Sequence, residues 1–143
     1  HQVTSLKTND LGNFYKENKI NYNLFSFEEN ILNIIYDTNL CITRAGASTL
    51  AELVFLNVPF IAIPYPLAKD DHQFQNAEFY KKRDSCWMLK QDEIKDKVLT
   101  NYLLNIIEDK NDYLTKKKNM KKISYQNTWN RINQKLISTI NEN

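Results

Sequence analysis

Glycine is scarce in this sequence, and its scarcity excludes several familiar nucleotide-binding and catalytic loops. The 143 residues contain only two glycines, Gly12 and Gly46. The chain therefore has neither a Walker A loop nor a Gly-x-Gly-x-x-Gly fingerprint, because both need glycines at fixed spacings. A Gly-x-Ser-x-Gly elbow is absent as well. The sequence therefore lacks the usual signatures of ATPases, dehydrogenases and esterases.

Cysteine and histidine are equally scarce. Cys41 and Cys86 each lie in an apolar run that predicts a buried strand, so we expect reduced thiols in the core rather than a disulfide framework. The two histidines are His1 and His72, and the cysteines are far apart in the sequence. The sequence therefore predicts no metal site, and it gives no sign of a cofactor.

Charge of one sign and long hydrophobic runs are also missing. A net charge of +2 is too small to argue for nucleic acid, and no RNP strand or zinc finger is present, so we expect no nucleic-acid partner. No stretch approaches the length that spans a bilayer, and we expect no signal peptide before the domain. The basic run 116–118 with Lys121 and Lys122 predicts a solvated helix face, with binding of anionic lipid or acid as the alternative.

Apolar runs alternate with helical patterns along the chain. We expect strands at 21–25, 40–43, 60–63 and 86–89, and helices at 8–19, 28–36, 49–56, 72–83, 92–108, 111–121 and 124–140, with Asp92 capping the helix that it begins. This alternation predicts an α/β fold with a Rossmann-like parallel sheet flanked by helices on both faces. In such sheets, ligands bind outside the carboxyl ends of the strands.

The chain begins with His1 rather than Met, and no turn or cap precedes its first residues. We therefore expect a single domain over 1–143 that is truncated at its N-terminus, with a helical C-terminal tail over 111–143.

The turn Arg44-Ala-Gly-Ala-Ser-Thr stands where a strand pattern changes to a helix pattern. Unpaired N–H groups at a helix start bind phosphate readily, and Gly46 allows close approach of a ligand or a positive φ. A tight connection without a ligand explains the turn equally well. Thr49 and Glu52 have the spacing of a capping box, but Glu52 could instead accept hydrogen bonds from ribose hydroxyls.

A second polar loop, 64–77, precedes and enters the next predicted helix. It offers amides, carboxylates and the imidazole of His72, a set that suits a hydroxyl-rich ligand because amides donate and accept at once. Capping by Asp70 or Asp71, with Asn76 inside the helix, is the alternative interpretation.

Four segments together resemble the C-terminal donor-binding domain of the MurG family, glycosyltransferase family 28 with the two-domain GT-B fold. They are Phe27-Glu-Glu-Asn, Arg44-Ala-Gly-Ala-Ser-Thr-Leu-Ala-Glu52, Pro59-Phe-Ile-Ala-Ile-Pro64 and Asp71-His-Gln-Phe-Gln-Asn-Ala77. Their order and spacing both fit, over roughly residues 1–110. The resemblance implies that the chain is the C-terminal half of a GT-B enzyme.

The same resemblance implies a set of residues that bind UDP-N-acetylglucosamine: Arg44, Gly46, Ala47, Ser48, Thr49, Glu52, His72, Gln73, Asn76 and Glu28. The turn would lie against the diphosphate and Glu52 would hold the ribose. His72 and Gln73 would contact the sugar, with Asn76 beyond them. Arg44 would lie near phosphate or in a structural ion pair, and the backbone at Glu28 near the uracil.

The implied function is donor binding in an inverting glycosyltransferase that transfers N-acetylglucosamine from UDP to lipid-linked muramoyl-pentapeptide, which converts lipid I to lipid II in peptidoglycan synthesis. The catalytic base, the acceptor site and the membrane contact are expected in a missing N-terminal domain, so this chain alone is expected to be inactive. The intact enzyme would be peripheral on the cytoplasmic face of the bacterial inner membrane. The alternatives are a non-catalytic UDP-sugar-binding subunit of a split transferase and an α/β interaction module whose polar loop residues are caps.

Overall fold

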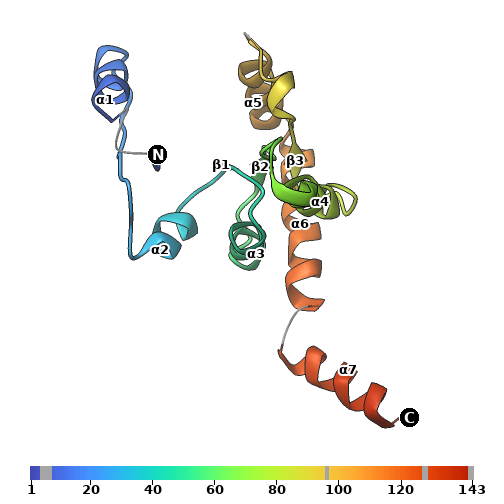
Figure 1. Cartoon of the computed structure of the whole chain (residues 1–143). Helices are drawn as coiled ribbons and strands as arrows, with labels where there is room; N and C mark the ends of the chain where they lie inside the picture. The colour runs from blue at the N-terminus through green and yellow to red at the C-terminus, as the bar shows by residue number, and fades with distance from the viewer. Residues whose placement is uncertain (4–7, 96, 127–128, 142–143) are drawn as a thin grey trace. The chain divides into compact units, whose positions relative to one another are not determined.

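Three short strands form a parallel sheet in the larger of the chain's two units (Figure 1). The computed structural model describes residues 1–3, 8–95, 97–126 and 129–141, and the units are residues 1–34 and 35–143. The strands are β1 (Cys41–Thr43), β2 (Phe60–Ala62) and β3 (Trp87–Met88), in the order β1-β2-β3. The register pairs Ile42 with Ile61 and Ala62 with Met88. The predicted α/β class with a parallel sheet is confirmed.

Successive residues of β2 point to opposite faces of the sheet, and all three are buried. Phe60 and Ala62 belong to one apolar cluster, and Ile61 belongs to the other. β2 therefore lies in the middle of the sheet with both faces covered, which explains why its sequence is a continuous apolar run rather than an alternating one.

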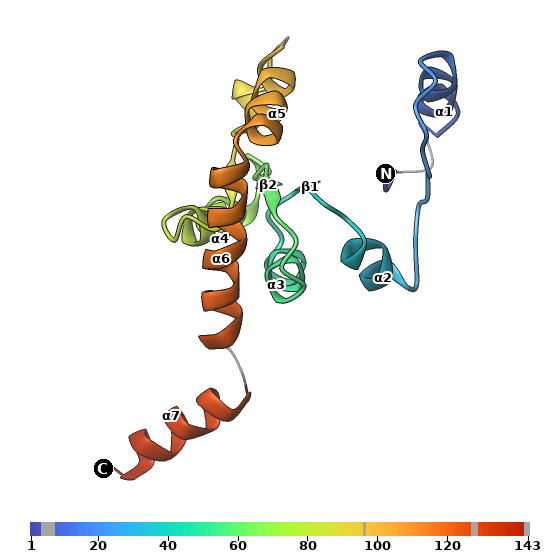
Figure 2. The same ribbon diagram turned by 180° about the vertical axis from the view of Figure 1, so that it is seen from behind.

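Helices α3 (Ala47–Phe55), α4 (His72–Lys81) and α6 (Lys110–Gln126) cover the face that carries Phe60 and Ala62. Figure 2 shows α6 running past this part of the unit, with α3 to one side and α4 to the other. The buried side chains that the helices contribute are Leu50, Leu53, Val54, Ala77, Met120 and Ile123.

Helix α5 (Val98–Glu108) covers the opposite face of the sheet. Its residues Leu99, Tyr102, Leu103 and Ile106 pack against Ile61, Ile63, Trp87 and Leu89, together with Tyr113 from the start of α6. Helices thus flank both faces of the sheet, as the sequence predicts.

Lys116 of α6 is buried at the amino-terminal edge of the sheet. Its Nζ lies 2.6 Å from Oδ1 of Asp84 and 2.6 Å from Oδ1 of Asp112. Trp87 Nε1 donates to the other oxygen of Asp112 at 2.7 Å. The prediction that Lys116 lies on a solvated helix face is wrong, because its side chain is only 7% exposed and faces two carboxylates. Lys118, Lys121 and Lys122 are exposed.

The ion pair changes the pKa of both partners. Burial by itself raises the pKa of Asp112, but the hydrogen bonds from Lys116 and Trp87 outweigh it and hold the pKa below its ordinary value. Burial by itself lowers the pKa of Lys116, but the two carboxylates raise it overall. Both groups are therefore charged across the neutral range.

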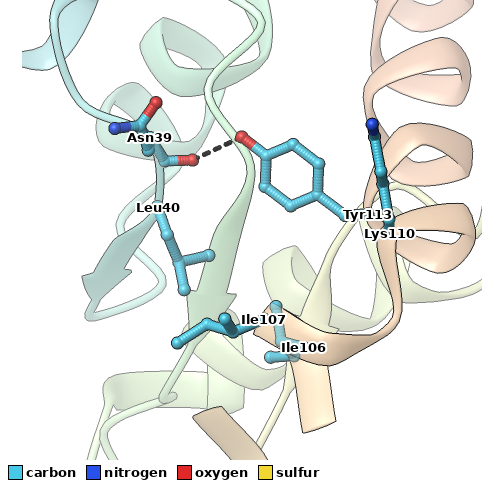
Figure 3. A pocket seen from close by; sticks show the side chains of 6 residues that line it. All are labelled: Asn39, Leu40, Ile106, Ile107, Lys110 and Tyr113. Atoms are coloured by element: carbon cyan, nitrogen blue, oxygen red, sulfur yellow. Dashed lines mark hydrogen bonds between the residues drawn. The ribbon is translucent and has the colours of Figure 1, made fainter. Parts of the chain in front are cut away.

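A mostly apolar pocket of about 370 Å³ lies beside this edge (Figure 3). Figure 3 shows Tyr113 reaching across to Asn39, to whose carbonyl oxygen its hydroxyl donates at 2.8 Å. The rest of the lining consists of Leu40, Ile106, Ile107 and Lys110.

Both cysteines are free thiols, in line with the expectation from the sequence. Cys86 is buried next to β3, and burial raises the pKa of its thiol to about 12. Cys41 is half-buried in β1, and burial raises its pKa as well. Neither thiol is activated as a nucleophile.

The unit of residues 1–34 contains α1 (Thr8–Glu17) and most of α2 (Ile31–Tyr36). The strand predicted at 21–25 is wrong, because among the described residues this segment makes only an isolated parallel bridge, between Phe25 and Gln2. The rings of Tyr15 and Tyr22 pack together, with their centroids 5.1 Å apart.

Several predicted helix boundaries shift. The helix predicted from Asp92 begins only at Val98, because 91–93 forms a separate 3₁₀ turn, η3 (Gln91–Glu93). In the tail, α6 ends at Gln126 rather than near 121 and α7 (Trp129–Asn141) follows, while 127–128 of the second predicted tail helix fall outside the described residues. None of the described helices combines the length and apolar character that crossing a bilayer requires.

Candidate functional site

The turn after β1 brings Gly46 to the N-cap of α3. Gly46 has φ −67° and ψ 136°, an extended conformation that any residue adopts, so the alternative of a positive φ is wrong. A Cβ at this position would meet only Oγ1 of Thr49, at 3.9 Å, which is ordinary contact. Neither backbone strain nor packing within the described chain therefore requires glycine here.

The first turn of α3 presents amide groups without helical partners. The first helical bond runs from Leu50 N to Gly46 O at 3.0 Å, so the N–H groups of Ala47, Ser48 and Thr49 precede it. Ala47 and Ser48 are exposed and Thr49 is half-buried. These amides lie at the positive end of a nine-residue helix. The arrangement can hold an anion such as a diphosphate.

Thr49 and Glu52 do not form a capping box, because α3 begins at Ala47 and not after Thr49. The N-cap residue, Gly46, has no side chain, and the structure shows no side-chain capping bond at this helix. Glu52 lies in the second turn of α3, one turn beyond Ser48, and is half-buried. Capping therefore explains neither residue, and hydrogen bonding of Glu52 to ribose hydroxyls stays a prediction.

Arg44 and Tyr65 link the ends of β1 and β2. Arg44 is exposed, and its Nη1 makes long contacts to the carbonyl oxygens of Ile63 and Pro64, at 3.4 and 3.5 Å. Its guanidinium carbon lies 5.6 Å from the centre of the Tyr65 ring. Within the described part of the chain Arg44 has no carboxylate partner. The structural ion pair offered as an alternative is thus absent there, and the positive charge is available to a ligand.

Two amide side chains of α4 hold the loops of this edge in place. Asn76 Nδ2 donates to the carbonyl oxygen of the fully buried Ala45 at 3.0 Å. Gln73 Oε1 accepts from the backbone N–H of Tyr65 at 2.9 Å. Asn76 thus fixes the turn before Gly46, while Gln73 keeps its Nε2 donor for a ligand. Contact of either side chain with a sugar stays a prediction.

His72 begins α4 and is exposed. Its Nδ1 lies 2.7 Å from the carbonyl oxygen of Lys69. Because a carbonyl only accepts, Nδ1 must carry the proton, and Nε2 of the neutral ring is then an acceptor. Asp71 occupies the N-cap position without a side-chain capping bond, so capping by its carboxylate is wrong.

The sequence predicts no binding role for the residues after β3 and indicates Asp92 only as a helix cap. Lys90, Gln91 and Asp92 line a pocket together with Tyr65 and other residues of the loop after β2. Their position directly after a predicted strand could have indicated them, because the carboxyl ends of all three parallel strands meet at one edge of the sheet.

Glu28 belongs to the other unit, where its Oε1 accepts from the backbone N–H of Asn30 at 2.9 Å. A role of its backbone near a base stays a prediction. Among the residues described, no three His, Cys, Asp or Glu side chains gather in a way that would hold a metal ion.

Comparison with known proteins gives a consistent result. The model of the glycosyltransferase family 28 C-terminal domain matches residues 1–132. The UDP-N-acetylglucosamine–N-acetylmuramyl-(pentapeptide) pyrophosphoryl-undecaprenol N-acetylglucosamine transferase of Pelagibacter ubique (strain HTCC1062) is 53% identical over 142 residues, which are 99% of this chain and 40% of that protein. The transferase of the same name from Rickettsia bellii (strain RML369-C) is 39% identical over 97 residues, 68% of this chain and 27% of its own.

A solved structure agrees in fold. The crystal structure of MurG from Acinetobacter baumannii matches with a TM-score of 0.76 and 21% identity, over 100% of this chain and 40% of that one. The chain thus spans about 40% of the Pelagibacter relative and of the solved structure. Because the family model covers 132 of the 143 residues, the chain belongs to the family of glycosyltransferase family 28 C-terminal domains.

Proposed function

We propose that this chain binds the UDP-N-acetylglucosamine donor of an inverting glycosyltransferase, which transfers N-acetylglucosamine to lipid-linked muramoyl-pentapeptide in peptidoglycan synthesis. The family membership and the printed names of the relatives support this substrate. The intact enzyme would work at the cytoplasmic face of the bacterial inner membrane, and its acceptor site and catalytic base would lie outside this chain.

The observation that carries the proposal is the first turn of α3. Its free amides follow Gly46, a glycine that neither φ nor packing in the described chain explains. A phosphate that must come close to the backbone does explain it, since a Cβ would stand between the ligand and the N–H groups. Arg44 at the end of β1 adds positive charge beside the same turn.

The role of this turn in the reaction follows from charge. When the bond between the sugar and the diphosphate breaks, negative charge grows on the departing UDP. Prealigned N–H groups at a helix start stabilise that charge without reorganising, which lowers the barrier. The chain would therefore stabilise the leaving group, while a base elsewhere deprotonates the acceptor hydroxyl.

Glu52 would complete the nucleotide site by accepting hydrogen bonds from the ribose. Its position one helical turn beyond Ser48 places it on the same side of α3 as part of the free-amide turn. A carboxylate is an acceptor with two oxygens, which matches the two adjacent hydroxyls of a ribose.

The test is calorimetric titration of UDP-N-acetylglucosamine into the chain and into Glu52→Gln. Hydrogen bonds to a charged group contribute about 1.5–3 kcal/mol, so we expect the variant to bind roughly ten to a hundred times more weakly. Glu78→Gln is the matched control, because it removes the same charge from α4, where Glu78 pairs with Lys82. Equal affinity of the wild type and Glu52→Gln would remove Glu52 from the site.

A further inference from the structure

The pocket of about 370 Å³ beside the amino-terminal edge of the sheet shares no residue with the proposed nucleotide site. It lies between the residues that precede β1, the last turn of α5 and the first turn of α6 (Figure 3). We call it the α5–α6 pocket. Sites for small molecules begin at about 300 Å³. The volume therefore suits a single small organic molecule.

The lining of the α5–α6 pocket separates apolar side chains from polar ones. Three aliphatic side chains lie lower in the view of Figure 3, those of Leu40, Ile106 and Ile107. The polar ends of Asn39, Tyr113 and Lys110 all lie higher in the same view. Such a lining suits a ligand that has a polar head at one end and an apolar body at the other.

Lys110 gives the polar part of the pocket a positive charge. Its side chain is exposed and makes no ion pair with any residue that the structure describes. The neighbouring Asp109 uses its Oδ1 to accept from the backbone N–H of Asp112 at 2.9 Å, and Asp112 pairs with Lys116. The charge of Lys110 is therefore available to an anion, in contrast to that of Lys116 on the same helix.

Asn39 adds a hydrogen-bond donor, and Tyr113 forms a fixed wall. The side-chain amide of Asn39 has no partner among the described residues, so its Nδ2 is left to donate to a ligand. The backbone carbonyl oxygen of Asn39 accepts from the Tyr113 hydroxyl at 2.8 Å, and the Trp87 ring stacks on the Tyr113 ring with centroids 6.4 Å apart. These contacts hold the Tyr113 ring in place, so a ligand meets a preformed surface.

We propose that the α5–α6 pocket binds a small monocarboxylate with an unbranched acyl chain, whose carboxylate faces Lys110 and whose chain lies against Leu40 and Ile107. One ammonium group balances one negative charge. A carboxylate only accepts hydrogen bonds, which matches the donors of Lys110 and Asn39. Because Leu40 and Ile107 come from separate segments, a flexible chain can follow both. This binding is independent of the proposed nucleotide function.

The test is titration of octanoate into the ¹⁵N-labelled chain, read from the backbone amide signals of Leu40, Ile107 and Tyr113. We expect saturable shifts of these signals in the millimolar range. In a series that begins with butanoate, affinity should rise about fourfold for each added methylene until the pocket is full, and then stop rising. Affinity that keeps rising with chain length, with shifts spread over the whole chain, would overturn the proposal, because it indicates adsorption to the surface.

Lys110→Gln tests the contact with the carboxylate. The variant should bind octanoate about fivefold more weakly, the upper end for an exposed ion pair. 1-Octanol, which has the same chain without the charge, should bind the variant and the wild type alike. Lys118→Gln is the matched control, because Lys118 is exposed on the same helix and does not line the pocket. Equal octanoate affinity of the two variants would contradict the pairing with Lys110.

Ile107→Ala tests the contact with the acyl chain. Ile107 is 70% exposed, so the variant should fold, and octanoate should bind about fivefold more weakly because apolar contact area is lost. Leu104→Ala is the matched control, since Leu104 is exposed on α5 and lies outside the lining. If both variants bind octanoate equally well, the chain does not lie in this pocket.

Two further ligands separate the α5–α6 pocket from other sites for anions. UDP should not displace octanoate, because the turn at Gly46 lies at the opposite edge of the sheet. Displacement by UDP would place octanoate in the nucleotide site and overturn the proposal. Vesicles of phosphatidylglycerol that move the three amide signals, without any response to free octanoate, would overturn it as well, because they would assign the pocket to a lipid surface. Calorimetry with Glu52→Gln tests the nucleotide function separately, since octanoate needs no contact with Glu52.

Discussion

The two edges of the three-stranded sheet treat their polar groups in opposite ways. At the amino-terminal edge, α6 closes the structure, and Lys116 places its ammonium group between Asp84 and Asp112 with 7% of its side chain exposed. At the carboxyl edge, polar groups such as Arg44 and His72 are exposed, and the first amides of α3 have no helical partner. One edge uses its polar groups on protein partners, and the other keeps them for solvent or a ligand.

This difference separates stability from binding within one small unit. A polar group with buried protein partners contributes to the folded state and has little left for a ligand. An exposed group with unused donors contributes little to folding but can bind. Substitutions at the amino-terminal edge should therefore change the free energy of unfolding, and substitutions at the carboxyl edge should change affinity.

The largest expected effect is at Lys116. Lys116→Ala removes the charge that faces two carboxylates and should lower the free energy of unfolding by about 3 kcal/mol, the lower end for a broken buried ion pair. The lower end applies because the side chain of Asp84 is 58% exposed and stays hydrated. Urea denaturation measures the change.

Lys118→Ala is the control for Lys116, because Lys118 is exposed on the same helix. It should change the free energy of unfolding by no more than about 0.5 kcal/mol. If the two variants unfold alike, the amino-terminal edge is not the stabilising one. Nucleotide affinity, measured well below the unfolding transition, should be the same in both.

The next effect is at Gly46 and concerns binding. Gly46→Ala adds a Cβ that meets only Thr49 Oγ1 within the described chain, so stability should change by no more than about 0.5 kcal/mol. The same Cβ would stand between the free amides and a phosphate, and we expect affinity for UDP to fall at least about tenfold by calorimetry.

Gly12→Ala gives the matching control, since the only other glycine lies inside α1 and a Cβ there also meets ordinary contacts, at 3.5 and 3.7 Å. This substitution should raise stability by up to about 1 kcal/mol through helix propensity and leave UDP affinity unchanged. Unchanged UDP affinity in Gly46→Ala would show that the first turn of α3 does not hold the diphosphate.

Asn76 tests the comparison from the other side, because it lies at the carboxyl edge of the sheet but donates a hydrogen bond to the protein backbone. Asn76→Ala leaves the carbonyl oxygen of the buried Ala45 without its partner and should cost about 1 kcal/mol of unfolding free energy. Affinity for UDP should fall modestly as well, because the turn before Gly46 loses its support. Measurement of both quantities on one variant decides whether Asn76 acts on the fold alone.

The strands and their helical cover could be predicted from sequence, whereas the helix starts could not. The apolar runs at 60–63 and 86–89 predict buried strands because no polar residue interrupts them. The run at 40–43 also forms a strand, but the prediction that it is buried is wrong, because Ile42 is exposed and its two neighbours in β1 are half-buried. Thr49 with Glu52 has capping spacing, but the small residues before Thr49 let α3 begin two residues earlier, at Ala47. Asp92 likewise looks like a cap, yet its segment closes as a separate turn. Sequence spacing identifies candidate N-cap residues, but it does not show at which residue the helix begins.

The burial of Lys116 could not be predicted from the sequence either, for a different reason. Asp112, four residues away, predicts an ordinary surface pair on one helix. The burial comes from Asp84 and Trp87, which are about thirty residues away in the sequence and reach Lys116 only through the packing of α6 on the sheet edge. Lysine runs carry no signal of such a contact, so the sequence predicts a solvated helix face.

The smallest expected effect is the response of the amino-terminal edge to acid. The folded pKa of Asp112 is below its ordinary value of 3.8, so its contribution to stability is present above about pH 4 and is lost as pH falls through the lower folded pKa. The raised pKa of Lys116 acts only at the alkaline end, where its contribution fades as pH rises past 10.5 and through the folded pKa. Between these limits the stability of this edge should not depend on pH.

Urea denaturation at neutral pH and below pH 4 measures how much unfolding free energy is lost in acid. This loss should be smaller in Asp112→Asn than in the wild type, since the amide cannot titrate. Identical acid losses in the two proteins would mean that the Lys116 pair adds nothing to acid stability and that the closed edge is held by its apolar contacts alone.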